Sequence, residues 1–153
     1  MPRRFRFSLE KVLDVRQWEE KQAENLLAAK TGECTNCELA IQDLHRRRHD
    51  TFLTRGSGDL NLTVLAVHDA FRLRLGKEIE TKVKHLARLT VEREDLLKTY
   101  LETRKRREVV SKLKEKQALA FKQAEAKRET LRLDDLNTAA FIRKMRPLEE
   151  TIG

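Results

Sequence analysis

The chain contains very few residues that interrupt a helix. Residues 8–54 contain one glycine and no proline, and the same is true of residues 61–146. Between these segments lies Arg55-Gly56-Ser57-Gly58-Asp59, whose two glycines oppose a helix because of their backbone entropy. This pattern predicts two long helices, at about 8–54 and 61–146, joined by a loop at 55–60.

The expected helix ends follow from capping residues. Ser8 and Asn61 can accept hydrogen bonds from the first turn of a helix, so they are candidate N-caps. Pro147 disfavours helical geometry at the residue before it. The second helix is therefore expected to end at or before Arg146.

The composition favours a coiled coil over a compact globule. Charged residues make up 38% of the chain and aromatic residues 5%, so few large side chains are available to fill a core. The net charge of +8 suits a partner with an acidic surface, or nucleic acid. Because basic and acidic residues are interspersed, most of this charge is expected to solvate the outer helix faces.

Apolar residues recur at heptad spacing in both segments, which predicts the face through which the helices meet. Seven of ten seam positions in the first segment are apolar when cysteine is counted as a small hydrophobe, and six of eight in the second. The predicted seam comprises positions 13, 16, 20, 23, 27, 30, 34, 37, 41 and 44, and positions 75, 79, 82, 86, 89, 93, 96 and 100.

The same register becomes more polar after Tyr100, with four apolar residues in the next nine positions. An antiparallel hairpin that turns at Ser57 accounts for this change, because Leu13 then lies opposite about Leu101 and the first helix ends. The second helix is expected to project alone from about residue 108 to 143. The predicted fold is all-α: one antiparallel coiled-coil hairpin over residues 1–153, with the second helix longer.

Two cysteines and two histidines have the pairwise spacing of zinc ligands: Cys34, Cys37, His45 and His49. A zinc finger needs about twelve residues between the two pairs, whereas seven are present here. In a continuous helix Cys34 and His45 lie about 16 Å apart along the axis, too far for ligands of one ion. We therefore expect no metal site, and both cysteines are predicted to pack in the seam.

The sequence shows no catalytic pattern. Gly56-Ser57-Gly58 lacks the Gly-Lys-Ser/Thr of a phosphate loop, and no nucleophile stands with a histidine and an acid as in a triad. The cluster at 104–107 could contact phosphates, but few aromatic residues that stack on bases accompany it. We expect a non-enzymatic protein without a cofactor or a nucleic-acid partner. With no long apolar run and no signal-peptide pattern, a cytoplasmic location is expected.

The N-terminus resembles that of the flagellar export protein FliJ family. Members typically begin aromatic-basic-aromatic, followed by Leu-x-x-Val-Leu-x-x-Arg. Here the residues are Phe5-Arg6-Phe7-Ser8-Leu9-Glu10-Lys11-Val12-Leu13-Asp14-Val15-Arg16. The similarity continues in Lys98-Thr99-Tyr100, the basic cluster through Arg107, Ser111-Lys112-Leu113-Lys114-Glu115-Lys116-Gln117, and the acidic block Leu133-Asp134-Asp135-Leu136.

This resemblance implies an antiparallel coiled coil similar to the central stalk of rotary ATPases. Members of the family bind the flagellar type III export ATPase, FliI, at the centre of its hexameric ring. They also engage the export gate protein, FlhA, and cycle export chaperones. The chain is therefore expected to serve flagellar biogenesis and motility as a coupling component. It would associate peripherally, through its partners, with the cytoplasmic face of the inner membrane at the flagellar base.

The resemblance also implies two partner-binding surfaces. Leu9 and Leu13 could equally begin the seam, Leu75 is expected in the core, and Phe71 lies on a different stripe that favours exposure. The expected ATPase contacts are Phe5, Arg6, Leu9, Leu13, Arg106, Arg107, Lys116 and Phe121. The expected gate contacts, near the hairpin tip, are Leu44, Arg47, Phe71 and Leu75.

The sequence is also compatible with two other classes of function. A basic coiled-coil module that binds nucleic acid would show tight binding with a steep salt dependence. A dimerising scaffold would bury the extra length of the second helix against another copy. The homologous injectisome stalk proteins are a close variant of the first interpretation.

Overall fold

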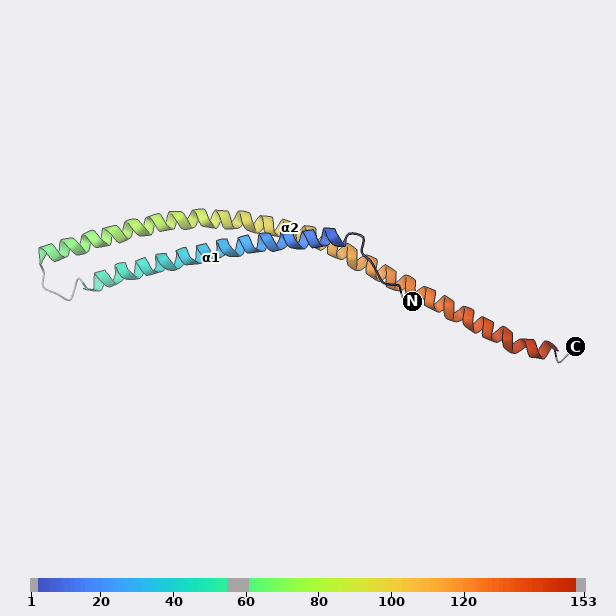
Figure 1. The fold of residues 1–153 in the computed structure, drawn as a ribbon. Coiled ribbons are helices and arrows are strands. Elements are labelled where there is room, and N and C mark those ends of the chain that lie inside the picture. The colour runs from blue at the N-terminus through green and yellow to red at the C-terminus, as the bar shows by residue number, and fades with distance from the viewer. Residues whose placement is uncertain (1–2, 55–60, 151–153) are drawn as a thin grey trace. The chain divides into compact units, whose positions relative to one another are not determined.

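The computed structural model describes residues 3–54 and 61–150, with side chains described as far as Arg146. Two helices contain most of these residues: α1 spans Glu10–Thr54 and α2 spans Leu62–Glu150 (Figure 1). α2 has 89 residues and α1 has 45, so the prediction of two long helices with the second longer is confirmed. The predicted loop at 55–60 lies outside the described residues.

Of the two predicted N-caps and the predicted end of the second helix, only the N-cap at Asn61 agrees with the structure. Asn61 is the N-cap of α2, because its side-chain oxygen accepts a hydrogen bond from the Thr63 amide at 3.0 Å. The prediction for Ser8 is wrong, since the first α-helical bond of α1 runs from the Leu13 amide to the carbonyl of Leu9. α2 also continues past Pro147 to Glu150, so the prediction that it ends at or before Arg146 is wrong. The proline removes one amide donor and crowds the carbonyl four residues before it, a local cost that does not end the helix there.

The chain divides into two compact units. The first, called here the hairpin unit, is residues 16–106 and holds most of α1 against the first half of α2. The second, called the terminal unit, combines residues 1–15 with residues 107–153. Each unit brings together residues that are far apart in the sequence.

The core of the hairpin unit follows the predicted seam. Cys34 and Cys37 pack with Leu89 in one buried cluster, and Leu44 packs with Leu75 and Ile79 in another. Cys34 is 2% exposed, so its predicted role as a packing residue is confirmed. All ten predicted seam positions of α1 are buried or half-buried, and seven of the eight in α2 are as well.

The pairing of the two helices differs from the predicted register. Lys30 lies 3.0 Å from Glu92, and the Arg72 guanidinium stacks over the ring of Phe52 at 5.3 Å. In sequence number, the midpoint between Lys30 and Glu92 is residue 61 and that between Phe52 and Arg72 is residue 62, whereas the predicted register requires residue 57. The predicted pairing centred on Ser57 is therefore wrong, because a heptad pattern looks the same after a shift of one repeat and cannot fix the register alone.

In the terminal unit, the N-terminal residues lie against α2. The rings of Phe5 and Phe121 have centroids 5.7 Å apart, and Lys114 forms an ion pair with Glu10 at 2.8 Å. Half-buried positions recur every three or four residues of α2 from Arg107 to Glu125. The prediction of an uncovered helix from 108 to 143 is therefore wrong for its first part. The uninterrupted stretch of exposed residues begins only at residue 126 and extends to residue 146.

The more polar seam after Tyr100 did not mark the end of the pairing. Residues 107, 110, 114 and 121, which the same register selects, are half-buried although two of them are charged. Long basic side chains can cover a partner with their aliphatic stems and place the charge at the edge. The ion pair of Lys114 with Glu10 is an example.

Candidate functional site

The N-terminal segment before α1 has two different faces. Residues 3–7 are not helical, and side chains of an extended segment alternate between opposite sides. Phe7 is buried and Phe5 is half-buried, whereas Arg4 and Arg6 are exposed. This alternation attaches the segment through its two aromatic rings and presents the guanidinium groups to solvent.

The residues expected to contact the ATPase fall into three groups. Leu13 is 4% exposed, so it packs inside the terminal unit and cannot contact a partner directly. Phe5 and Phe121 contact each other and are half-buried. The exposed members in this unit are Arg6, Leu9 and Lys116, while Arg107 is half-buried and Arg106 is an exposed residue of the hairpin unit.

The last part of α2 is the largest uncovered feature of the terminal unit. We call residues 126–146 the C-terminal arm; every one of them is exposed. Leu131, Ile142 and Met145 follow one another at spacings of eleven and three, which places them on one face of a helix. Six large apolar side chains of the arm are 49–63% exposed: Leu131, Leu133, Leu136, Phe141, Ile142 and Met145.

The arm is also basic. It carries six lysine or arginine residues against three aspartate or glutamate residues. Arg128 pairs with Glu125 at 2.9 Å, and Arg132 lies 4.0 Å from Glu129, so part of this charge is balanced along the helix. The basic residues nearest its end are Arg143, Lys144 and Arg146.

The residues expected to contact the export gate are divided between core and surface. Leu44 and Leu75 are buried in one cluster, so the expectation that Leu75 is core is confirmed. Phe71 is 44% exposed, which confirms the expectation for its stripe, and Arg47 is exposed. Arg47 lies 2.9 Å from Asp43. A hydrogen bond from Arg46 holds the pKa of Asp43 below its ordinary value of 3.8.

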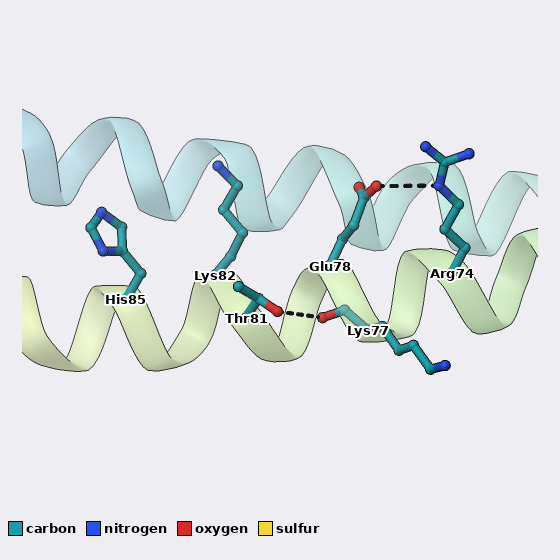
Figure 2. A pocket seen from close by; sticks show the side chains of 6 residues that line it. All are labelled: Arg74, Lys77, Glu78, Thr81, Lys82 and His85. Atoms are coloured by element: carbon teal, nitrogen blue, oxygen red, sulfur yellow. Dashed lines mark hydrogen bonds and ion pairs between the residues drawn. The ribbon is translucent and has the colours of Figure 1, made fainter.

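A shallow depression of about 440 Å³ lies on α2 just after Phe71 (Figure 2). Arg74 and Glu78 form an ion pair of 3.7 Å at one end, and Lys82 and His85 extend from the same helix at the other. Arg88 donates a hydrogen bond to Nδ1 of His85 at 2.8 Å if that nitrogen is unprotonated. The six lining residues are Arg74, Lys77, Glu78, Thr81, Lys82 and His85.

Sequence reasoning missed several residues that shape these surfaces. Phe7 is a buried anchor, and the signal for it was the alternation of aromatic and basic residues at positions 4–7. The pairing of Glu10 with Lys114 had no signal, because many acidic and basic residues are present in both segments. The sequence shows that the arm contains apolar residues in a predicted helix. Their exposure was not predictable, because it depends on which helix faces other residues cover.

Long helices that pair through a narrow seam, with a basic and partly apolar arm left uncovered, define a coiled-coil protein that acts through partners. The family model described as Flagellar FliJ protein matches residues 5–146. The chain therefore belongs to the flagellar FliJ protein family and is a component of the flagellar type III export system. Comparison with curated proteins and with solved structures gave no significant match. Within residues 3–54 and 61–150, neither helix has a stretch apolar enough to cross a membrane.

Proposed function

We propose that this chain is the stalk and coupling component of the export apparatus. It binds the export ATPase ring through the C-terminal arm and the N-terminal segment, and it binds the export gate through the surface near Phe71. In this role it assists the cycling of export chaperones and their substrates. It acts at the cytoplasmic face of the membrane at the flagellar base, held there by its partners.

The observation that carries the proposal is the uncovered arm. A helix of about 20 residues that packs against nothing is marginal in water, because most helix stability in proteins comes from burying one face. The arm exposes Leu131, Ile142 and Met145 on one face and has an excess of basic residues. A partner with an apolar and acidic pore would bury these side chains and stabilise the helix.

The N-terminal segment adds basic residues to the surface that we propose binds the ATPase ring. Phe5 and Phe121 hold the segment against α2, and Glu10 pairs with Lys114. Arg6 and Lys116 are exposed beside these contacts and can meet acidic groups of the ring. In this proposal the aromatic residues position the segment, and the basic residues contact the partner.

For the gate, the proposal assigns the direct contacts to Phe71, Arg47 and the depression on α2. Leu44 and Leu75 are buried, so they contribute by holding the two helices together under this surface. Lys82 and His85 line the depression, and a gate segment with acidic and apolar side chains would complement them. Replacing Phe71 by alanine and Lys82 by glutamate should each weaken gate binding.

The ATPase proposal is tested by removing the arm alone. A chain that ends at Glu125 keeps the contact of Phe5 with Phe121 and that of Glu10 with Lys114. We expect it to remain folded by circular dichroism and to lose stimulation of the export ATPase. Full stimulation by the shortened chain would reject the role given to the arm.

A matched pair of variants separates a loss of contact from a loss of stability. Leu136→Ser with Phe141→Ser removes exposed apolar groups from the arm, and Leu26→Ser with Leu39→Ser removes similarly exposed groups from the hairpin unit. We expect the arm variant to bind the ATPase at least about tenfold more weakly, and the control to bind normally. Sedimentation equilibrium of each protein shows whether self-association through the arm competes with the ATPase.

A further inference from the structure

The end of the hairpin unit nearest Thr54 and Asn61 exposes many large apolar side chains. We call residues 43–54 and 61–74 the tip. Elsewhere in the hairpin unit most exposed residues are charged or polar, whereas α2 begins with Leu62-Thr63-Val64-Leu65-Ala66-Val67. Seven large apolar side chains of the tip are 44–83% exposed: Phe52, Leu53, Leu62, Val64, Val67, Phe71 and Leu73.

These residues cover more than one face of α2. Leu62 and Leu73 are eleven residues apart, about three turns, so they lie on one flank. Val64, Val67 and Phe71 follow at spacings of three and four, which places them on another flank. Between the flanks, the side that faces α1 carries Leu65, which is half-buried. The start of α2 is therefore apolar nearly all round, although only one side packs against α1.

Apart from the surface around Phe71 that is assigned to the gate, this distribution favours a lipid surface over a protein groove. A groove covers one stripe of a helix, while a helix that is apolar on all sides is normally surrounded by an apolar medium. Because the exposed residues lie at the end of the hairpin unit, they can enter the outer layer of a bilayer together without crossing it.

The charges of the tip match an anionic surface. The tip contains five arginines and three aspartates. Arg46 pairs with Asp43 at 2.6 Å and Arg74 with Glu78 at 3.7 Å, but 72% and 79% of the two arginine side chains are exposed, so their remaining N–H groups can reach lipid headgroups. Arg72 stacks over Phe52, which places a further cation beside one of the exposed rings. Long arginine side chains can lie along apolar groups while their guanidinium groups contact phosphate.

We propose that the tip binds the surface of an anionic bilayer, inserting Leu62, Val67 and Leu73 among the lipid chains while Arg46 and Arg74 contact headgroup phosphates. This binding is direct and needs neither the ATPase nor the gate. It would orient the hairpin unit with its tip at the membrane. Its success or failure is independent of the ATPase proposal, because the two surfaces lie in different units.

The test is sedimentation of the full chain with large vesicles. One set contains phosphatidylcholine alone, and the other contains 30% phosphatidylglycerol. The tip variant is Leu62→Ser with Leu73→Ser, and the matched control in the same unit is Leu26→Ser with Leu39→Ser. We expect the chain and the control to bind the anionic vesicles, and the tip variant to bind at least about tenfold more weakly.

Two further experiments test the contribution of the arginine charges and the insertion of residue 62 into the bilayer. Replacing Arg46 or Arg74 by glutamine should each weaken binding to anionic vesicles by roughly fivefold, and added salt should weaken it further. A chain with Leu62→Trp and Trp18→Phe carries one tryptophan at the tip, whose emission should shift to the blue with anionic vesicles only.

Three results would overturn the proposal. These are no binding of the full chain to anionic vesicles at low salt, equal binding by the tip variant and the control, and equal binding to both vesicle types. If the tip variant loses gate binding while the full chain ignores vesicles, the tip is a protein-binding surface and the lipid proposal fails.

Discussion

The ammonium group of Lys114 lies 2.8 Å from the carboxylate of Glu10, although 104 residues separate them in the sequence. This pair joins the first turn of α1 to the second half of α2. Together with the contact of Phe5 and Phe121, it shows that the N-terminal residues cover α2 well beyond Tyr100. The uncovered arm is correspondingly shorter, at residues 126–146.

Truncating Leu89 should destabilise the hairpin unit. Leu89 is 4% exposed and packs with both cysteines, so Leu89→Ala removes buried methyl groups and leaves a cavity in a narrow seam. We expect the free energy of unfolding in urea to fall by about 2–4 kcal/mol. The control is Leu97→Ala on an exposed face, which should change it by less than about 1 kcal/mol. Equal effects of both substitutions would mean that Leu89 is not a core residue.

Replacing Phe121 by alanine should release the N-terminal segment. The ring of Phe121 is the aromatic partner of Phe5, so its loss removes a contact that holds residues 3–9 against α2. We expect trypsin to cut after Arg4 and Arg6 several-fold faster, with little change in the helical content. Leu119→Ala, two positions away and exposed, is the control and should leave the cleavage rate unchanged. Unchanged cleavage in the Phe121 variant would show that the segment is held by other contacts.

The ion pair of Lys30 and Glu92 predicts a defined pH dependence. A hydrogen bond from Lys30 lowers the pKa of Glu92 from 4.5, and the same bond raises the pKa of Lys30 from 10.5. The stabilisation from Glu92 is therefore present above pH 4.5 and is lost as the pH falls through its lowered folded value. The stabilisation from Lys30 is present below pH 10.5 and is lost as the pH rises through its raised folded value.

We expect Glu92→Gln to lower the stability at neutral pH and to make little difference at pH 2. Both partners are partly exposed, so the effect should be small and should shrink with added salt. Urea unfolding of the wild-type chain, Glu92→Gln and the control Glu94→Gln at both pH values measures this. A deficit for Glu92→Gln that persists unchanged at pH 2 would contradict the pairing.

The sequence allowed the seam to be predicted because packing imposes a strict spacing. Most residues at spacings of three and four must be apolar or small, and Cys34, Cys37 and Leu89 satisfy this rule. Asn61 was predictable for a similar reason, since an N-cap side chain bonds an amide only two or three residues further along, here that of Thr63. Both features follow from fixed spacings within one helix.

The register and the extent of pairing could not be predicted in the same way. Sliding one helix by a heptad keeps apolar residues opposite apolar residues, so the pattern alone did not distinguish a centre at 57 from one at 61. Phe5 and Phe7 lie before α1, where helical periodicity does not apply, and their contribution to the covered length was missed. The surfaces proposed to bind the ATPase and the gate consist of exposed residues. Because exposure depends on the register of the two helices, these surfaces could not be predicted either.

The central claim is that the N-terminal residues close over α2 as far as Phe121 and leave the arm from residue 126 uncovered. Zero-length carbodiimide coupling of the native chain tests it, because this reaction joins only carboxylates and amines in direct contact. We expect mass spectrometry of the monomer to identify the links Glu10–Lys114 and Lys30–Glu92. A link of Glu10 to Lys105, as a pairing centred near residue 57 requires, in place of the link to Lys114 would contradict the account.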